Sequence, residues 1–255
     1  MALLKIAKLT KEFGGLKAVS NFNMEINRGE LIGLIGPNGA GKTTAFNLIT
    51  GVYEPTSGQM DFDGKSLIGL KPYQVTQRGI ARTFQNIRLF ADLSVLDNVK
   101  IAYHFHVKYG VAESVLRVGR YYPEEDEIEA KALECLKMFK LDDRRDEIAR
   151  NLPYGEQRRL EIARALAAQP QLLLLDEPAA GMNPQETHEL MEMIRWIRDE
   201  LKLTILLIEH DMSLVMGVCE RIYVLDYGSI IAEGTPAEIR SNPQVIEAYL
   251  GEEVN

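Results

Sequence analysis

The chain has 255 residues, of which 46% are hydrophobic and 26% are charged, as in an ordinary globular protein. This length is ample to bury a core, which excludes a mini-protein that depends on disulfides or a metal for stability. The 29 basic and 37 acidic residues give a net charge of −8, which argues against a protein that mainly binds the backbone of a nucleic acid.

Nothing in the sequence indicates export or a membrane-spanning segment. The two cysteines, Cys135 and Cys219, lie too far apart for a CxxC redox or zinc pair, which favours a reducing cytosol. The N-terminal segment MALLKIAKLTKEF interrupts its apolar positions with lysines, unlike a signal peptide. The longest apolar runs, Leu172–Leu175 and Ile205–Ile208, fall far short of the roughly 20 residues that span a bilayer. We expect a chain that does not cross a membrane but could dock on one.

The N-terminal part is predicted to contain strands followed by a strand-loop-helix unit. Leu3–Leu9 and Val19–Ile26 alternate partly between apolar and polar residues, which predicts an antiparallel sheet. Leu31–Ile35 is a compact apolar run that stops at a glycine-rich loop, and Lys42–Thr50 then has helical character.

The glycine-rich loop fits the pattern G-x-x-x-x-G-K-[ST]. Its residues are Gly36, Pro37, Asn38, Gly39, Ala40, Gly41, Lys42 and Thr43, and Thr44 follows. In such a loop the glycines let backbone N–H groups turn toward a phosphate, the lysine reaches the β and γ oxygens, and the threonine hydroxyl can bind Mg²⁺. The position after a buried strand and at a helix N-terminus favours an anion site.

The middle of the chain, from about Leu93 to Arg150, is predicted to be mostly helical. It carries the densest charge, including the acidic run 124–127, which is equally compatible with a solvated surface that has no chemical role. Because Leu31–Ile35 and Leu172–Leu175 are expected to be neighbours in one sheet, we interpret this segment as a helical insertion.

The C-terminal part alternates buried strands with capped helices. Leu172–Leu175 and Thr204–Ile208 are apolar without alternation, which is typical of a parallel sheet covered by helices. Asn183, with a proline behind it and an acid at the third position, predicts the start of a helix that runs to about Leu201, and Thr235 repeats this pattern. The residues between Arg221 and Ala232 are expected to form a hairpin, with its turn at Asp226, Tyr227 and Gly228.

Polar side chains follow several of these strands. Asp176 and Glu177 come after the run of leucines, and His210 follows the next apolar strand. Open α/β sheets bind ligands at this edge, where Asp176 could bind magnesium and Glu177 could orient or deprotonate an attacking water. Gln85 follows the β-like stretch 79–84, and its amide could contact both Mg²⁺ and the water. Each residue also has a structural interpretation: a helix cap or solvated loop for the acids, a purely structural role for His210, and an ordinary surface position for Gln85.

These motifs together resemble the ATP-binding subunits of ABC transporters over nearly the whole chain. The resemblance implies an α/β P-loop NTPase (RecA-like) core with a parallel sheet, an N-terminal antiparallel β subdomain and an inserted α-helical subdomain at about 86–168. By similarity, Phe13 stacks on adenine with Val19 beside it, 36–43 is the Walker A loop, and Gln85 is the Q-loop glutamine. Likewise Leu172–Asp176 is the Walker B strand, Glu177 the catalytic base, Ala180–Asn183 the D-loop and His210 the switch histidine. The signature lies at LPYGEQ, with Pro153, Tyr154, Gly155, Glu156 and Gln157 expected to meet the partner's ATP.

Within this family the segments RTFQNIRLF, PYGEQRRLEIARAL and EPAAGMNP look like the LivG-type ATPases of branched-chain amino acid importers. Two residues depart from the usual signature, because Pro153 replaces a serine whose hydroxyl meets the γ-phosphate and Tyr154 replaces a glycine. Backbone N–H groups at Gly155 would still face the phosphate. Asn183 replaces an aspartate of many relatives, which favours a helix cap over a proton relay.

The resemblance implies a magnesium-dependent ATPase that works as a dimer, because each ATP lies between one subunit's Walker loop and the partner's signature helix. The expected partners are a second ATPase (an identical copy or a LivF-like sister), two membrane permease subunits and an extracytoplasmic solute-binding protein, with no nucleic acid. The chain would then be cytoplasmic, peripheral on the inner face of the membrane. Arg88, Leu89 and Phe90 are candidate permease contacts, although Leu89 and Phe90 could equally be core residues.

The sequence leaves three alternative functions open. They are an ABC ATPase for an amide, urea or a lipid, a non-transport ATP switch, and a cassette that binds ATP but hydrolyses it poorly.

Overall fold

In a computed structural model, which describes residues 2–250, the chain divides into two compact units. The core unit comprises residues 1–82 and 171–255, and the helical unit comprises residues 83–170. Among the described residues, no helix combines the length and apolar character that a bilayer crossing requires.

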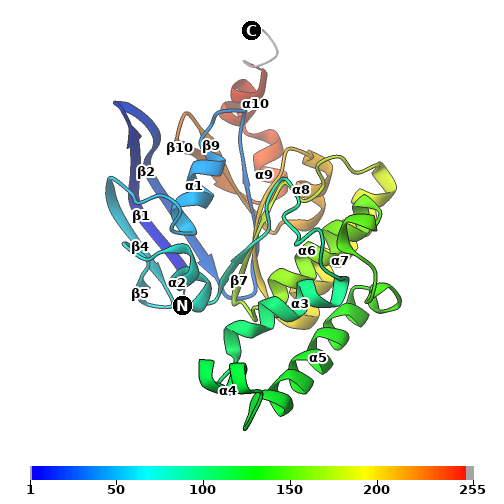
Figure 1. The fold of residues 1–255 in the computed structure, drawn as a ribbon. Helices are drawn as coiled ribbons and strands as arrows, with labels where there is room; N and C mark the ends of the chain where they lie inside the picture. The colour runs from blue at the N-terminus through cyan, green and yellow to red at the C-terminus, as the bar shows by residue number, and fades with distance from the viewer. Residues whose placement is uncertain (1, 251–255) are drawn as a thin grey trace. The chain divides into compact units, whose positions relative to one another are not determined.

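The core unit contains two sheets (Figure 1). A four-stranded sheet has the order β2-β1-β4-β5, and a six-stranded sheet has the order β10-β9-β3-β8-β7-β6. The strands are β1 (Ala2–Phe13), β2 (Leu16–Asn27), β3 (Leu31–Ile35), β4 (Ser57–Phe62), β5 (Lys65–Ser66), β6 (Ile80–Arg82), β7 (Leu172–Asp176), β8 (Thr204–Ile208), β9 (Arg221–Asp226) and β10 (Ser229–Gly234). The helices are α1 (Lys42–Ile49), α2 (Pro72–Gln77), α7 (Pro184–Leu201), α8 (Met212–Val218), α9 (Pro236–Ser241) and α10 (Pro243–Leu250).

The burial of the strands explains this division. Every residue of β3, β7 and β8 is buried, as expected for parallel strands covered on both faces. β1 pairs antiparallel with β2 and β4, and β10 pairs antiparallel with β9. The predicted parallel sheet, N-terminal antiparallel sheet and C-terminal hairpin are therefore confirmed.

The order of the strands corrects one expectation. β3 and β7 are not neighbours, because β8 lies between them and pairs in parallel with both. An apolar run shows that a strand is buried on two faces, but it does not show which strand lies beside it. The order depends on how the crossover helices pack, which the local pattern does not encode.

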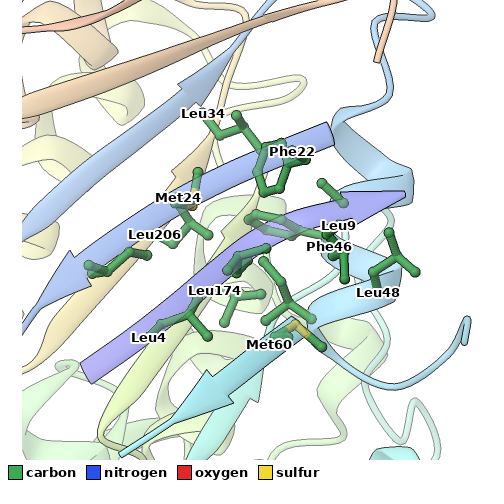
Figure 2. Packing of buried hydrophobic residues seen from close by; sticks show 14 of the residues in the cluster. Leu4, Leu9, Phe22, Met24, Leu34, Phe46, Leu48, Met60, Leu174 and Leu206 are labelled. Atoms are coloured by element: carbon green, nitrogen blue, oxygen red, sulfur yellow. The ribbon is translucent and has the colours of Figure 1, made fainter. Parts of the chain in front are cut away.

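The main core of this unit lies where the two sheets and α1 meet. Figure 2 shows side chains of β1, β2 and β4 converging on Phe46 of α1 and on Leu174 and Leu206 of the six-stranded sheet. Phe46, Leu174 and Leu206 are fully buried. The core thus holds α1, and with it the loop that precedes α1, against the six-stranded sheet.

The helical unit is built on three helices that contact one another, α3 (Val95–Tyr103), α5 (Tyr121–Met138) and α6 (Tyr154–Ala167). Its other elements are α4 (Val111–Leu116) and the 3₁₀ helices η1 (His104–His106), η2 (Asp142–Arg144) and η3 (Ala149–Asn151). The acidic run predicted in this region lies in α5. Glu124 accepts hydrogen bonds from two backbone N–H groups, and Glu125 accepts one from the Tyr109 hydroxyl, so these two carboxylates brace the loop 107–110.

Candidate functional site

The glycine-rich loop lies between β3 and α1, and two of its glycines are required by the geometry. Gly36 has a φ of +151°, and a Cβ there would lie 1.9 Å from the carbonyl oxygen of Leu225. Gly41 has a φ of +105°, and a Cβ there would lie 2.4 Å from the carbonyl oxygen of Ala18. The loop backbone therefore packs directly against neighbouring strands, which only glycine permits.

Lys42 is already held inside this loop. Its side chain is buried, and Nζ donates hydrogen bonds to the carbonyl oxygens of Gly36 at 2.6 Å and Pro37 at 2.8 Å. Thr43 is exposed and Thr44 half-buried in the first turn of α1, where no acidic side chain is present. A buried ammonium beside a helix N-terminus is an arrangement that favours a phosphate.

The two residues expected near adenine differ in exposure. Phe13 is 41% exposed, its ring lies edge-on to Tyr53 with centroids 5.2 Å apart, and Lys11 Nζ lies 4.9 Å from its centroid. Val19 has no exposed surface and belongs to the hydrophobic core. Phe13 could therefore offer its ring to a base, whereas Val19 packs in the core, and its expected place beside the nucleotide stays a prediction.

Asp176 ends β7 and is held by an arginine that the sequence did not single out. An Arg82 nitrogen donates to Asp176 Oδ2 at 2.7 Å, and the two side chains are only 8% and 6% exposed. The other terminal nitrogen of Arg82 donates to Asn47 Oδ1 at 2.7 Å and to Thr50 Oγ1 at 3.4 Å, and its guanidinium lies over the ring of Phe46. The guanidinium thus links the Asp176 carboxylate to α1.

Glu177 and His210 come together at the ends of β7 and β8. Glu177 Oε2 lies 2.7 Å from His210 Nε2, with the glutamate side chain 9% and the histidine side chain 50% exposed. The backbone of Glu177 has a φ of +47°, a left-handed conformation that is strained for glutamate. Its N–H donates to the carbonyl oxygen of Ile208 at 2.9 Å. The turn therefore fixes the backbone position of Glu177, and the contact with His210 fixes the position of its carboxylate.

Glu209 connects the loop after β7 to the loop after β8. The residue is 3% exposed. Its carboxylate accepts hydrogen bonds from the backbone N–H groups of Ala179 at 2.7 Å, His210 at 3.0 Å and Asp211 at 3.4 Å. Burial raises the pKa of the Glu209 carboxyl, and these hydrogen bonds oppose the rise.

Asn183 caps α7 as predicted. Its Oδ1 accepts hydrogen bonds from the N–H groups of Gln185 and Glu186 at 2.9 and 3.0 Å, and Glu186 Oε2 accepts one from the Asn183 N–H. This reciprocal cap ends the segment Ala180–Asn183.

The helical unit contains the remaining predicted residues. Gln85 is exposed in an irregular stretch after β6, and its carbonyl oxygen accepts a hydrogen bond from Arg158 at 2.8 Å. Phe90 is 46% exposed, and Arg164 lies over its ring, so Phe90 is not a core residue. Arg88 is exposed and Leu89 half-buried.

The signature residues form the start of α6. Pro153 is the N-cap and offers no side-chain cap, and Gln157 N donates to its carbonyl oxygen at 2.9 Å. Gln157 Nε2 donates to the carbonyl oxygen of Leu152 at 2.8 Å. Pro153 and Tyr154 are exposed, and Gly155 and Glu156 are half-buried. Proline therefore supplies no hydroxyl at this position, while the first residue of the helix is exposed.

The oxygen donors of the core unit suit magnesium. Mg²⁺ is usually held by one or two carboxylates together with substrate phosphates, and Thr43 and Asp176 supply a hydroxyl and a carboxylate of this kind. Across residues 2–250, no three His, Cys, Asp or Glu side chains gather into a group that could bind a metal ion by themselves. Thr43 and Asp176 thus fit a metal that arrives with a nucleotide.

Comparison with known proteins gives consistent results. The family model described as ABC transporter matches residues 19–180, and the model described as branched-chain amino acid ATP-binding cassette transporter matches residues 229–255. The high-affinity branched-chain amino acid transport ATP-binding protein LivG of Escherichia coli (strain K12) is 48% identical over 98% of both chains. BraF of Pseudomonas aeruginosa, described in the same words, is 43% identical over 98% of both.

Solved structures share the fold. The ADP conformation of MJ1267, an ATP-binding cassette of an ABC transporter, matches 98% of this chain and 99% of its own with a TM-score of 0.86 and 32% identity. A dimeric post-hydrolysis state of the cassette MJ0796, bound to ADP and Pi, matches 91% of this chain and 98% of its own with a TM-score of 0.76 and 28% identity.

Proposed function

Because the chain belongs to the family of ABC transporter ATP-binding subunits, we propose that it powers the import of branched-chain amino acids through separate membrane permease subunits. Members of this family hydrolyse ATP to drive transport. The observation that carries the choice of solute is the match of residues 229–255 to the branched-chain amino acid model. Relatives named for the same transport, 43% to 48% identical, support it.

We assign the binding of the ATP phosphates to the glycine-rich loop. Lys42 exchanges its bonds to the Gly36 and Pro37 carbonyl oxygens for bonds to phosphate oxygens, so its ammonium is positioned before the nucleotide arrives. Thr43 and Asp176 would hold Mg²⁺, which neutralises charge on the phosphates when bound. Phe13 would stack on the base.

Glu177 is proposed to orient and deprotonate the attacking water. Its carboxylate starts from a strained turn and contacts His210 Nε2 at 2.7 Å, so both ends of the side chain are restrained. Phosphoryl transfer depends mainly on such positioning. His210 would hold the carboxylate in place, and Gln85 would contact the metal and the water.

We expect hydrolysis to require a second ATPase subunit, either a copy of this chain or a LivF-like sister. The dimeric structure of the related MJ0796 cassette supports this arrangement. The α6 N-terminus, from Pro153 to Gln157, would then face the partner's nucleotide with backbone N–H groups. The permease would bind near Arg88 and Phe90 and would keep the protein on the inner face of the membrane, with a solute-binding protein on the other side.

The test is Mg²⁺-dependent ATP hydrolysis measured against protein concentration. For a dimerising ATPase we expect turnover to rise faster than linearly, and Glu177→Gln should abolish hydrolysis while retaining bound ATP. Glu200→Gln, an exposed position on α7, is the matched control and should behave like the unaltered chain. Turnover that survives in Glu177→Gln would remove Glu177 from the proposed role.

The choice of solute needs a separate experiment. Cells that lack this chain but retain its permease should lose uptake of radiolabelled leucine and regain it with the unaltered chain, but not with Glu177→Gln. Restored uptake of an amide or urea instead would assign a different importer. If the chain does not co-purify with any permease, a non-transport ATP switch becomes the better description.

A further inference from the structure

A buried ion pair in α6 holds the segment that contains Gln85. The side chains of Arg158 and Glu161 are 0% and 1% exposed, and a terminal nitrogen of Arg158 donates to Glu161 Oε2 at 2.8 Å. Both residues also reach outside their helix, and all of their hydrogen-bond partners described below lie within the helical unit.

The pair makes four hydrogen bonds to the backbone of residues 84–88. Arg158 donates to the carbonyl oxygens of Phe84 at 2.7 Å and Gln85 at 2.8 Å. Glu161 Oε1 accepts from the N–H groups of Arg88 at 3.1 Å and Phe84 at 3.4 Å. Donors and acceptors of the same short segment are therefore bound from one helix.

The local structure explains why the segment needs these partners. Residues 83–90 form neither helix nor strand, so no regular ladder satisfies their backbone groups. Buried or half-buried N–H and C=O groups must find other partners, and two charged side chains provide strong ones. Without the pair, the backbone on either side of Gln85 would lose these four hydrogen bonds.

The same arginine lies one helical turn from the signature residues. Arg158 follows Tyr154 by four positions, and its guanidinium lies 3.2 Å from the Tyr154 hydroxyl oxygen. One turn of helix rises about 5.4 Å. The side chain that binds the Gln85 carbonyl oxygen therefore also contacts the first residue of α6.

We propose that Arg158 and Glu161 are positioning residues that fasten residues 84–88 to the N-terminal turn of α6. Gln85 and the segment Pro153–Gln157 then move as one body, so a displacement of either is carried to the other through α6. This inference rests on the proposed function, in which Gln85 contacts one nucleotide's metal and water and the signature contacts the partner's nucleotide. The pair thereby couples the two sites that a dimer would use.

The test replaces both members with apolar residues of similar size, in the variant Arg158→Met with Glu161→Leu. Replacing a buried pair in this way generally preserves folding, whereas removing one partner leaves a buried charge. The surface pair Glu127–Lys131 lies in the same unit, on α5, with side chains 61% and 45% exposed. Its replacement, Glu127→Leu with Lys131→Met, is the matched control.

Hydrogen exchange gives the readout that a merely stabilising role would not produce. In the folded double variant we expect the amides of Phe84 and Arg88 to exchange about 10-fold faster or more, while amides of α3 and α5 stay protected. The control variant should leave all of them unchanged. Unchanged protection at Phe84 and Arg88 in a folded double variant would overturn the inference, whatever the chain's activity.

Kinetics provide the second readout. We expect kcat for ATP hydrolysis to fall about 10- to 100-fold, because a loosened Gln85 no longer moves with the signature turn, while KM for ATP changes little. Arg158→Lys should be intermediate, since lysine restores the charge but not the planar fork. An unchanged kcat would overturn the coupling. If the unaltered chain shows no turnover with any partner, the proposed function fails, and the exchange experiment still decides the positioning role.

Discussion

Each unit of the molecule contains a buried arginine that is hydrogen-bonded to a carboxylate. The two arginines differ in their other hydrogen-bond partners. Arg82 in the core unit bonds other side chains, those of Asp176, Asn47 and Thr50. Arg158 in the helical unit bonds Glu161 and two backbone carbonyl oxygens. Both arginines are almost fully buried, so burial alone does not explain the difference.

The difference follows from the backbone around each arginine. Arg82 ends a strand whose backbone is paired with β7, so its guanidinium can be used to orient the carboxylate of Asp176. The segment beside Arg158 lies outside any strand, and the guanidinium donates hydrogen bonds to two of its carbonyl oxygens. Where strand pairing already fixes the backbone, the arginine is free to orient a functional side chain, as Arg82 does. Where the backbone lies outside a strand, the arginine binds the backbone itself, as Arg158 does.

The largest expected effect is that of Arg82→Met. It leaves the Asp176 carboxylate buried without its counter-charge, which should lower the free energy of unfolding by about 3–5 kcal/mol. Urea denaturation followed by circular dichroism measures this loss. Arg28→Met, which removes the exposed pair with Asp63, is the control and should cost less than about 1 kcal/mol. Equal effects of the two variants would mean that the Arg82 pair contributes no more than a surface pair.

A smaller loss of unfolding free energy is expected when one hydrogen-bond acceptor of Arg82 is removed. Asn47→Ala deletes a 2.7 Å hydrogen bond to the guanidinium, and such bonds to charged groups contribute about 1.5–3 kcal/mol. Thr50→Val removes the longer 3.4 Å contact and should cost less than about 1 kcal/mol. The same urea titration compares them. A larger loss for Thr50→Val than for Asn47→Ala would show that these residues stabilise the fold through the helix backbone and not through Arg82.

The smallest effect concerns a buried carboxylate whose hydrogen bonds come from backbone N–H groups. Burial raises the pKa of the Glu209 carboxyl above its ordinary value of 4.5, so the folded chain binds this proton more tightly than the unfolded chain. The stabilisation is present at low pH and is lost as the pH rises through the folded pKa. Because glutamine does not titrate, the stability of the unaltered chain relative to Glu209→Gln should decrease as the pH rises from about 4.5 through the folded pKa. Unfolding free energies of both proteins across this range measure the change, and a relative stability that increases with pH would contradict the assigned direction.

Much of the fold was predictable because its signals are local. Apolar runs predicted the buried strands, and the glycine-rich loop predicted the turn between β3 and α1. Asn183 and Thr235 predicted helix starts that the structure confirms. The catalytic and nucleotide-binding roles of Lys42, Glu177, His210 and Gln85 stay predictions. The structure adds that Glu177 contacts His210, which the positions of these residues after two apolar strands had only suggested.

The remaining features depend on residues far apart in the sequence. Nothing local marks the pairing of Arg82 with Asp176, 94 positions later. Charged residues on a helix are usually solvated, so nothing local marks Arg158 and Glu161 as a buried pair. Val19 is buried in the core, and its expected place beside a nucleotide stays a prediction.

The sequence by itself determined the family, the strand-loop-helix unit around Lys42 and the ends of several helices, because these depend on residue types at short, fixed spacings. Only the tertiary structure decided that β8 lies between β3 and β7, that Arg82 holds Asp176, and that α6 holds the backbone beside Gln85. The physical reason is that a buried charge or backbone group must find a partner wherever packing brings one close. Packing is a property of the whole chain, so local spacing cannot reveal which partner that is.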